Sequence, residues 1–406
     1  MKVLLVNKYF FIKGGAETVY FQESDRLKAA GVTVVDFSMQ HEKNAPSDYA
    51  KWFVSNVDYH GNSGIVGKIK TAINFIHNAE ACRKFNDLLL QEKPDIVHFH
   101  NIYHQLTPSI IAIAQRFGCK TVLTAHDYKI VCPSYTMLRD GHVCEACLEG
   151  SVFNAFRYRC QEGSAGKSLL LSLEAMWQDL ARNYHKLDAI ISPSAFLREK
   201  VIRKITDVPV EVIVNGIDDT QPMGDIRDDG YFLFIGRLSR EKGVATLAQA
   251  HRLMQHPLPL KIAGDGPLLQ DLRARFPEAE FLGYQQQGEG LNNLIRHARA
   301  VIVPSEYYEN CSMSVLEAMS FAKPVVGGNI GGIPEQIRDR QEGRLFEPGN
   351  AEQLAGILDE LAQNPDDARA LGERARQRLE NKYSLRVHMD ALIALYHKLL
   401  SGMPHD

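Results

Sequence analysis

The feature that restricts the fold most is an alternation that runs through nearly the whole chain. Short apolar runs rich in valine and isoleucine are followed by longer amphipathic stretches, as in parallel strands buried on both faces and the helices that cover them. In the first half the apolar runs are Lys2–Asn7, Val32–Ser38, Asp95–Asn101, Thr121–Asp127, Ala189–Ser194 and Glu211–Asn215. The pattern predicts an α/β fold.

The alternation begins again after a polar stretch at residues 218–230. The second set of predicted strands is Tyr231–Ile235, Leu260–Ala263, Glu280–Leu282, Ala300–Pro304, Pro324–Val326 and Gly343–Phe346. The predicted helices are Glu17–Ala30, Lys68–Leu90, Pro108–Phe117 and Ser168–His185 in the first half, and Gly243–Met254, Leu268–Phe276, Leu291–Ala298, Ser314–Phe321, Ala351–Ala362 and Asp366–Lys382 in the second. Two series of βαβ units predict two doubly wound, Rossmann-like domains facing each other across a cleft, at residues 1–215 and 216–384. A last amphipathic helix is predicted at Leu385–Leu400, within residues 385–406.

Composition excludes several classes of protein. A net charge of −3 in 406 residues argues against a protein that neutralises nucleic-acid phosphates over a broad surface, so no nucleic-acid partner is expected. No apolar run approaches the roughly 18 residues of a membrane-spanning helix. Asn7 and Lys8 interrupt the first apolar run too early for a signal peptide. Seven cysteines, an odd number, then favour a reducing, cytoplasmic location.

The first half is mildly basic, because residues 1–215 carry 25 basic and 22 acidic side chains. This excess could face an anionic surface, and it is equally compatible with ordinary variation in surface charge. One helical segment combines four basic residues with four isoleucines: Lys68, Lys70, Arg83 and Lys84 with Ile65, Ile69, Ile73 and Ile76. We expect peripheral membrane association there; the alternative is a core-packed helix with a solvated basic face.

The most specific motif occupies residues 304–320, where a strand, a loop and a helix follow one another. Glu309 lies in the loop and Glu317 lies eight residues later, inside the helix. The free N–H groups at the start of this helix are those of Asn310, Cys311, Ser312 and Met313, and they suit an anionic or hydroxyl-rich ligand. Glu309 and Glu317 could accept hydrogen bonds from the hydroxyls of a sugar and a ribose. The alternative is a capping acid and a solvated helical glutamate.

Two further strand-end loops lie in the second half. Gly236 and Arg237 follow its first strand, and Lys242 and Gly243 open the next helix, so both cations could reach a diphosphate. A basic surface patch is the alternative. Gly264 ends the following strand in a tight turn, which also lets the backbone approach a ligand.

In the first half, Gly14 and Gly15 follow the first strand and open a helix without the full G-x-G-x-x-G pattern. His126 and Asp127 follow another strand of the same sheet. A single histidine is usually structural, but ligands of doubly wound sheets bind at the carboxyl ends of the strands, so here both readings stand about even. We therefore keep His126 as a candidate.

Taken together, these motifs resemble the family-4 retaining glycosyltransferases of the GT-B fold, of the bacterial surface-polysaccharide type. The resemblance covers nearly the whole chain in the expected order. The matching positions are Gly14-Gly15, His126, Asn215-Gly-Ile, Gly236-Arg237-Leu, Glu241-Lys242-Gly243, Gly264-Asp-Gly-Pro and Glu309-x7-Glu317.

The resemblance assigns a role to each candidate. It implies that Arg237 and Lys242 bind the donor diphosphate, that Glu317 binds the ribose and that Glu309 binds the transferred sugar. It further implies that His126 lies beside that sugar, and that Gly14 and Gly15 shape the phosphate and acceptor side. The predicted donor site comprises Gly14, Gly15, Gly236, Arg237, Lys242, Gly264, Asn310, Cys311, Ser312 and Glu317, with Glu309, His126, Arg237 and Lys242 as catalytic candidates.

The chemistry expected from the residues agrees with this assignment. Arg237, Lys242 and helix N-termini can stabilise the charge of a departing nucleoside diphosphate. No Asp-x-Asp pair marks a strand end, so no catalytic cofactor is expected. The resemblance implies front-face displacement with retention, in which the departing phosphate deprotonates the acceptor hydroxyl, and it argues against Glu309 as the base.

The resemblance also implies the partners of the enzyme. The donor is a UDP- or GDP-linked hexose or N-acetylhexosamine. The acceptor is a glycan, expected to be lipid-linked at the inner membrane face, in surface polysaccharide or lipopolysaccharide synthesis. In this family the last helix commonly crosses back to the first domain. Two other functions remain open: a non-catalytic nucleotide-sugar-binding or regulatory subunit, and a phosphorylase or epimerase on the same fold.

Four of the seven cysteines gather in an insertion at about residues 128–164. Cys132, Cys144, Cys147 and Cys160 form the pattern C-x11-C-x2-C-x12-C, which fits a tetrahedral, structural zinc ion. His142 could replace one thiolate. The alternatives are free cysteines in a flexible lid or a redox-active pair at Cys144 and Cys147.

Overall fold

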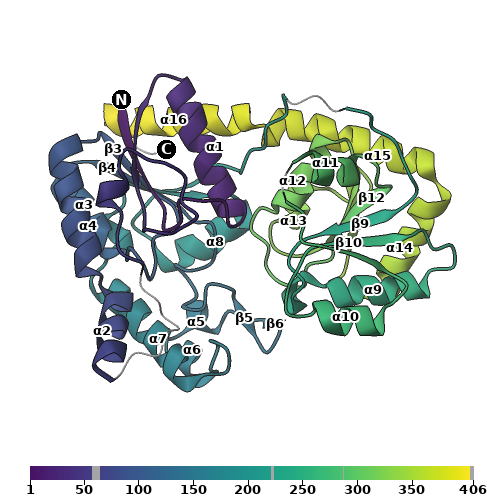
Figure 1. The fold of residues 1–406 in the computed structure, drawn as a ribbon, viewed down its shortest axis with the longest axis horizontal. Coiled ribbons are helices and arrows are strands. Elements are labelled where there is room, and N and C mark those ends of the chain that lie inside the picture. Colours follow the sequence, from purple (N-terminus) through teal and green to yellow (C-terminus); the bar gives the residue numbers. More distant parts are fainter. Residues whose placement is uncertain (57–64, 221–223, 287, 403–406) are drawn as a thin grey trace. The chain divides into compact units, whose positions relative to one another are not determined.

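The computed structural model describes residues 1–56, 65–220, 224–286 and 288–402, and it divides the chain into two compact units (Figure 1). The first unit comprises residues 1–139, 144–213 and 389 onward, and the second comprises residues 140–143 and 214–388. Within the predicted interdomain stretch, residues 221–223 lie outside the described residues, as do residues 403–406 of the predicted C-terminal segment.

The first unit contains a parallel six-stranded sheet in the order β2-β1-β3-β4-β7-β8. Its strands are β1 (Lys2–Val6), β2 (Thr33–Phe37), β3 (Ile96–Phe99), β4 (Lys120–Thr124), β7 (Ala189–Ser192) and β8 (Val210–Val212). Register places Leu4 opposite Val35 on one side and Val97 on the other. All three side chains are fully buried, as the apolar runs predict.

Helices of the first unit connect these strands. They are α1 (Gly15–Ala29), α2 (Ile65–Ile76), α3 (Ala79–Glu92), α4 (Ser109–Arg116), α7 (Ala165–Leu180) and α8 (Ala195–Lys204). The single helix predicted at Lys68–Leu90 is wrong. The helix is interrupted before Asn78, whose side chain accepts a hydrogen bond from the N–H of Ala81 (3.1 Å) and so begins α3.

Between β4 and α7 the chain forms the predicted insertion. Its regular elements are short: β5 (Leu138–Arg139), β6 (His142–Val143), α5 (Ala146–Glu149) and α6 (Asn154–Arg157). β5 and β6 pair with each other.

The second unit repeats the architecture, with a parallel sheet in the order β11-β10-β9-β12-β13-β14. Its strands are β9 (Phe232–Ile235), β10 (Leu260–Ala263), β11 (Glu280–Gly283), β12 (Ala300–Val303), β13 (Val325–Gly328) and β14 (Gly343–Phe346). Its helices are α9 (Val244–Leu253), α10 (Leu269–Arg275), α11 (Glu289–Arg296), α12 (Met313–Ser320), α13 (Ile333–Gln336), α14 (Ala351–Gln363) and α15 (Pro365–Arg378). Two Rossmann-like units with parallel sheets therefore confirm the predicted fold class.

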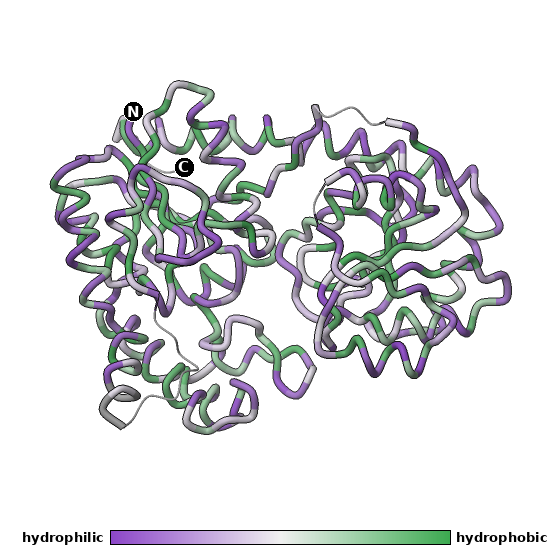
Figure 2. Tube along the Cα trace, viewed as in Figure 1, coloured by the Kyte–Doolittle hydropathy of each residue, from purple (hydrophilic) through white to green (hydrophobic). Residues whose placement is uncertain are grey.

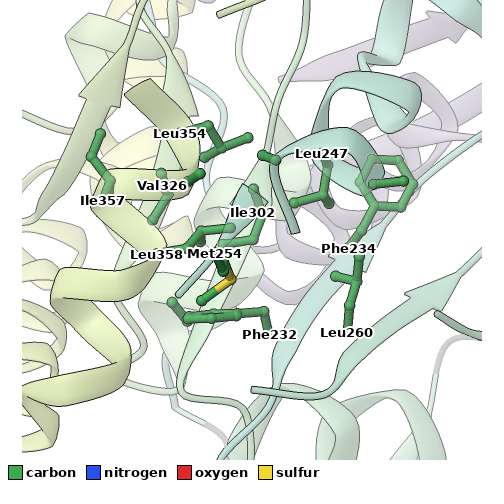
Figure 3. Close-up of a cluster of buried hydrophobic side chains, with 14 of the residues drawn as sticks. Phe232, Phe234, Leu247, Met254, Leu260, Ile302, Val326, Leu354, Ile357 and Leu358 are labelled. Carbon is green, nitrogen blue, oxygen red and sulfur yellow. The ribbon is translucent and has the colours of Figure 1, made fainter. Parts of the chain in front are cut away.

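The strands of both sheets are predominantly hydrophobic, whereas the helices alternate between hydrophobic and hydrophilic residues (Figure 2). Figure 3 shows one face of the second sheet, where side chains of β9, β10, β12 and β13 meet those of α9 and α14. Phe232, Leu260 and Ile302 are almost completely removed from solvent there. Burial of each such side chain stabilises the fold by about 1.5–3 kcal/mol.

The last helix, α16 (Leu385–Ser401), begins in the second unit after a π-helical turn at Leu379–Tyr383. The N–H of Leu385 donates to the carbonyl of Ile217, and the N–H of Ile217 donates to that of Tyr383. From Met389 onward α16 is grouped with the first unit, where the Tyr396 hydroxyl lies 2.7 Å from Nδ1 of His98. Among the described residues, none of the helices has the length and apolar character needed to span a bilayer.

Candidate functional site

In the second unit the chain reverses direction across the sheet between β9 and β12, which is the switch point where doubly wound folds bind ligands. Three loops lie at the carboxyl ends of β9, β10 and β12. The first carries Arg237 and Lys242, the second carries Gly264, and the third carries Glu309.

Glycines let the first two loops interlock. A methyl group at Gly264 would lie 1.8 Å from the carbonyl oxygen of Gly236, and one at Gly266 would lie 2.5 Å from that of Leu238. The N–H of Leu238 donates to the carbonyl of Asp265 (2.9 Å). The backbone therefore fixes these loops against each other with no room for side chains.

Gly243 brings the first loop against the third. It has φ of +65°, and a side chain there would lie 1.8 Å from the carbonyl oxygen of Pro304. The N–H of Glu306 donates to the carbonyl of Glu241 (2.9 Å). Lys242 and Glu309 are thus brought together by backbone contacts on either side of them.

Lys242 and Glu309 form an ion pair, with Nζ 2.7 Å from Oε1. Lys242 also donates to the hydroxyl of Tyr307 (3.0 Å), which donates to Oε2 of Glu309 (3.0 Å). The hydroxyl of Ser305 donates to Oε1 (2.7 Å). The side chain of Glu309 is 8% exposed and that of Lys242 is 27% exposed. Ser305 and Tyr307 were not predicted as site residues, although they flank Glu309 in the predicted loop.

These contacts keep both partners charged. Burial acts to raise the pKa of Glu309, but the charge and hydrogen bond of Lys242, with the hydroxyls of Ser305 and Tyr307, outweigh it and the pKa falls below its usual value. Burial acts to lower the pKa of Lys242, but Glu309 and Tyr307 outweigh it and that pKa rises. A carboxylate in this setting is a hydrogen-bond acceptor and a weak base.

Helix α12 begins at Met313, one residue after Ser312. The N–H of Ser312 donates to Oε1 of Gln336 (2.8 Å), and Nε2 of Gln336 donates back to the carbonyl of Ser312 (3.0 Å). The prediction that this N–H is free for a ligand is wrong, because a distant glutamine already binds it. Asn310 is buried, and burial raises the pKa of the Cys311 thiol to about 12, so this thiol stays protonated.

Glu317 lies within α12 and is half-buried. Burial alone raises the pKa of its carboxyl group to about 7. Glu309 and Glu317 are therefore chemically distinct: the first is held ionised, and the second titrates near neutral pH.

Arg237 differs from Lys242. It is exposed, and within the described part of the chain its side chain has no hydrogen-bonding or ionic partner. Its guanidinium is therefore available to a ligand, whereas the ammonium of Lys242 is already bound by Glu309.

In the first unit the switch point lies between β1 and β3. Gly15 is the first residue of α1, and Gly14, its N-cap, has extended backbone with φ of −170°. A methyl group at Gly14 would meet only Oε2 of Glu17, at 3.8 Å. The fold of the described residues therefore does not itself require glycine at position 14.

His126 follows β4 and forms a hydrogen bond through Nε2 with Nδ1 of His100 (2.8 Å). Nε2 of His100 and Nδ1 of His98 each lie 3.4 Å from Oε2 of Glu23, on α1. Nε2 of His98 lies 2.7 Å from the hydroxyl of Thr124. Glu23, His98 and His100 are buried and were not predicted. Two histidines at alternate positions of an apolar strand are the signal that could have shown them, because residues i and i+2 face the same side.

A second polar group lies beside this network. The hydroxyl of Tyr103 binds the carboxylate of Asp127, which also accepts the N–H of Lys129 (2.9 Å). Burial raises the pKa of Asp127, with Tyr103 and Lys129 opposing it, and burial lowers the pKa of Lys8 to about 8 against the pull of Asp127 and Glu17. Burial thus favours the neutral forms of both Asp127 and Lys8 at these strand ends.

Comparison with known proteins agrees with this geometry. Residues 13–221 match Glycosyltransferase Family 4, and residues 219–378 match Glycosyl transferases group 1. The chain is 25% identical to the alpha-maltose-1-phosphate synthase of Mycolicibacterium smegmatis, over 88% of this chain and 90% of that protein. It is 27% identical to the O-antigen chain mannosyltransferase C of Escherichia coli, over 57% of this chain and 66% of that protein.

A solved structure with the same fold is that of Anabaena HepE, in complex with UDP and glucose. It superimposes with a TM-score of 0.67 at 15% identity, over 98% of this chain and all of the other. At that identity the likeness shows the fold alone. The family match covers more than half of the chain, and the fold of both units agrees with it, so this chain is a member of Glycosyltransferase Family 4 with the GT-B fold.

Proposed function

We propose that this chain transfers a sugar from a nucleotide-sugar donor to a glycan acceptor with retention of anomeric configuration. The observation that carries the proposal is the Lys242–Glu309 ion pair, held at the switch point of the second sheet by interlocked glycine loops. A fixed cation beside a fixed carboxylate suits a ligand that carries both phosphates and hydroxyls.

The cations act on the diphosphate. Negative charge grows on the leaving nucleoside diphosphate as the glycosidic bond breaks, and preorganised cations stabilise that charge. Lys242 is fixed in place by Glu309 and Tyr307, and Arg237 is free to bind the phosphate oxygens in a fork.

Glu309 accepts hydrogen bonds from hydroxyls of the transferred sugar. Its lowered pKa makes it a poor proton acceptor at neutral pH, which supports the proposal that it is not the catalytic base. The acceptor hydroxyl then loses its proton to the departing phosphate on the same face of the sugar, and that face gives retention.

Glu317 accepts hydrogen bonds from the two ribose hydroxyls. A carboxylate has enough lone pairs for both, whereas a protonated carboxyl group presents a donor of its own. Since the pKa of Glu317 is about 7, nucleotide binding should release a proton near neutrality. Asn310, Cys311 and Ser312 then contribute to the donor side through the loop and the first turn of α12.

We propose that His126, in the first unit, contacts the transferred sugar, and that Gly14 and Gly15 of the same unit leave room for phosphate or acceptor. The hydrogen bond from His100 and the carboxylate of Glu23 behind it orient the imidazole of His126. His126 is thereby oriented through two successive side chains, those of His100 and Glu23.

We infer that the donor is a UDP- or GDP-linked hexose or N-acetylhexosamine. The support is the likeness to relatives whose names specify a mannosyltransferase and a maltose-1-phosphate synthase, and to a fold that holds UDP and glucose. The acceptor we infer is a lipid-linked glycan of a surface polysaccharide such as lipopolysaccharide, supported by the O-antigen enzyme of Escherichia coli.

We also infer a cytoplasmic enzyme bound peripherally to the inner membrane face. The predicted cation set needs correction, because it lies on two helices. The side chains of Lys68, Ile65 and Ile69 are outside the described residues, and Lys84 is engaged by the carbonyl of Phe53 (2.6 Å) and by Glu80 (3.0 Å). Lys70 and Arg83 are exposed.

Apolar support for this surface comes from α2 and α7, which pack on each other. Ile73, Trp177 and Leu180 are 58%, 46% and 72% exposed. Flotation with anionic and neutral liposomes at low and high salt tests the surface, with Trp177→Ser as the variant. Equal recovery with both lipids, or none with either, would refute electrostatic membrane binding.

A screen of UDP- and GDP-sugars tests the function directly, by measuring nucleotide diphosphate release with acceptor and thermal protection without it. Thermal protection without transfer for any acceptor would favour the non-catalytic binding subunit. Absence of both would refute the donor site.

A further inference from the structure

The insertion between β4 and α7 contains little regular secondary structure. Its elements are two-residue strands and four-residue helices. Five of the eleven non-glycine residues with positive φ among the described residues lie in it: Tyr135, Met137, Asp140, Arg159 and Glu162. Such backbone conformations cost free energy and persist only where the surroundings enforce them. Something other than secondary structure must hold this segment.

The four cysteines of the insertion are the residues that converge. The N–H of Ala155 binds the thiol of Cys147, and the carbonyl of Ala155 accepts the N–H of Cys160 (3.0 Å). The N–H of Cys144 donates to the carbonyl of Met137 (2.8 Å). Met137 lies five residues after Cys132, so this bond brings the segments of the two cysteines together. The thiols of Cys132, Cys160 and Cys144 all lie close enough to act electrostatically on Cys147.

Burial separates these cysteines from a reactive pair. Cys132 and Cys147 are 7% and 8% exposed, and none of the four forms a disulfide. Reactive cysteines are accessible to solvent, whereas buried structural cysteines are inert. The clustering is also selective, because Cys82 lies on α3, Cys119 precedes β4 and Cys311 belongs to the second unit.

We propose that Cys132, Cys144, Cys147 and Cys160 bind one structural zinc ion that staples the insertion. Zinc takes four thiolates in a tetrahedron at about 2.3 Å, and a full set of protein ligands leaves no position for a substrate. Each thiol gives up a proton on binding, so the site carries a net charge of −2. His142 is exposed and unnecessary once four sulfurs are in reach.

Closure around the ion requires the sulfur atoms to move closer together. No three of the four sulfur atoms lie within 4.8 Å of one another, whereas ligands of one tetrahedral ion lie closer than that. Among the described residues the group that meets that spacing is Glu23, His98 and His100. We assign no metal there, because both nitrogens of His98 already form hydrogen bonds of 2.7 Å.

The proposed zinc site affects the segment that follows β4. Cys132 lies six residues after His126, and its N–H donates to the carbonyl of Tyr128 (2.8 Å). Beside it, the buried Nζ of Lys129 binds the carbonyl of Pro133 (3.0 Å) and the carboxylate of Glu174 (2.6 Å). Zinc bound to Cys132 would therefore fix the backbone that follows His126. The proposal is independent of the donor and the acceptor.

Metal content of the full-length protein, purified without chelator, is the first test. We expect about one zinc per chain, retained by the matched control Cys82→Ser, and a loss of most of it in Cys147→Ser and Cys144→Ser. Less than about 0.2 zinc per wild-type chain, or iron in its place, would overturn the assignment.

A second measurement uses the wild-type protein alone and does not depend on the folding of variants. Thiol titration under native conditions should leave four thiols protected until a strong chelator is added, and zinc should then be released in step with their modification. Cobalt exchanged into the protein should show the charge-transfer absorption of tetrahedral thiolate ligation. Protection that chelator does not change, or a Cys144–Cys147 disulfide, would contradict the proposal.

Discussion

The loops of the second unit and the strand ends of the first are built differently, although both stand at the switch point of a parallel sheet. In the second unit backbone packs on backbone: Gly264 on Gly236, and Gly243 on Pro304. In the first unit side chains hold one another, from Glu23 through His100 to His126. Backbone interlocking places Lys242 and Glu309 rigidly, whereas a side-chain network can also set the protonation of the group it holds.

The largest expected effect tests the interlocked loops of the second unit. Lys242→Met removes a fixed cation from the diphosphate and should lower kcat by about 100- to 1,000-fold. Arg275→Met removes an exposed cation of the same unit, paired with Asp271 at 3.0 Å, and should leave kcat unchanged. Steady-state transfer assays on both variants, after circular dichroism confirms folding, decide this. A Lys242→Met enzyme within threefold of wild type would show that the pair is only structural.

A pair of glycine substitutions compares the two units directly. Gly264→Ala places a methyl group 1.8 Å from a backbone oxygen, so we expect a loss of more than about 3 kcal/mol of unfolding free energy. Gly14→Ala meets nothing closer than 3.8 Å and should cost less than about 1 kcal/mol. Chemical denaturation of both proteins measures the difference. Equal losses would remove the distinction between the two units.

The pH dependence of stability tests Glu317. Its folded pKa of about 7 exceeds the unfolded value of 4.5, so between these pH values the folded state binds more protons. Stability should therefore fall as pH rises through this window, by about 3 kcal/mol in total. Glu317→Gln should abolish that part of the slope. Parallel pH profiles for wild type and Glu317→Gln would show that the carboxyl group is not perturbed.

The smallest expected effect concerns the side-chain network of the first unit. Glu23→Gln removes the carboxylate beside His100 and with it the preference for one proton arrangement between His100 and His126. We expect kcat to fall about 10-fold with the nucleotide KM unchanged, and Glu23→Asp to recover part of it. If kcat and its pH profile are unchanged in Glu23→Gln, Glu23 does not position His126.

The difference between the units also explains what the sequence could predict. Each of the twelve predicted apolar runs overlaps a strand of the structure, because buried parallel strands are marked by their own residues. Helix α8 was not predicted, and the break at Asn78 was hidden by the surrounding amphipathic pattern. Asn78 reads as an ordinary polar residue of a helix until its side chain is seen capping Ala81.

Site residues, too, could be predicted where their own segment of sequence marks them. The backbone interlock leaves glycines in the sequence, so Gly236, Gly243 and Gly264 could be found. Glu23 could not, because its partners His98 and His100 are more than seventy residues away and a helical glutamate looks solvated. Gln336 occupies the N–H of Ser312 for the same reason: the contact joins residues far apart in the chain.

The most direct test of the central claim separates binding from transfer in Glu309→Gln. The amide keeps the shape of the side chain, but the charge opposite Lys242 is lost. Ser305 and Tyr307 donate to different oxygens of Glu309, so the one oxygen of the amide can accept from only one of them. Isothermal titration with UDP and GDP, alongside transfer from the active nucleotide sugar, gives both quantities. We predict nucleotide affinity within about threefold of wild type and transfer reduced by about 100-fold or more. Transfer that remains near wild type, or that falls only in proportion to nucleotide affinity, would contradict the assignment of Glu309 to the transferred sugar.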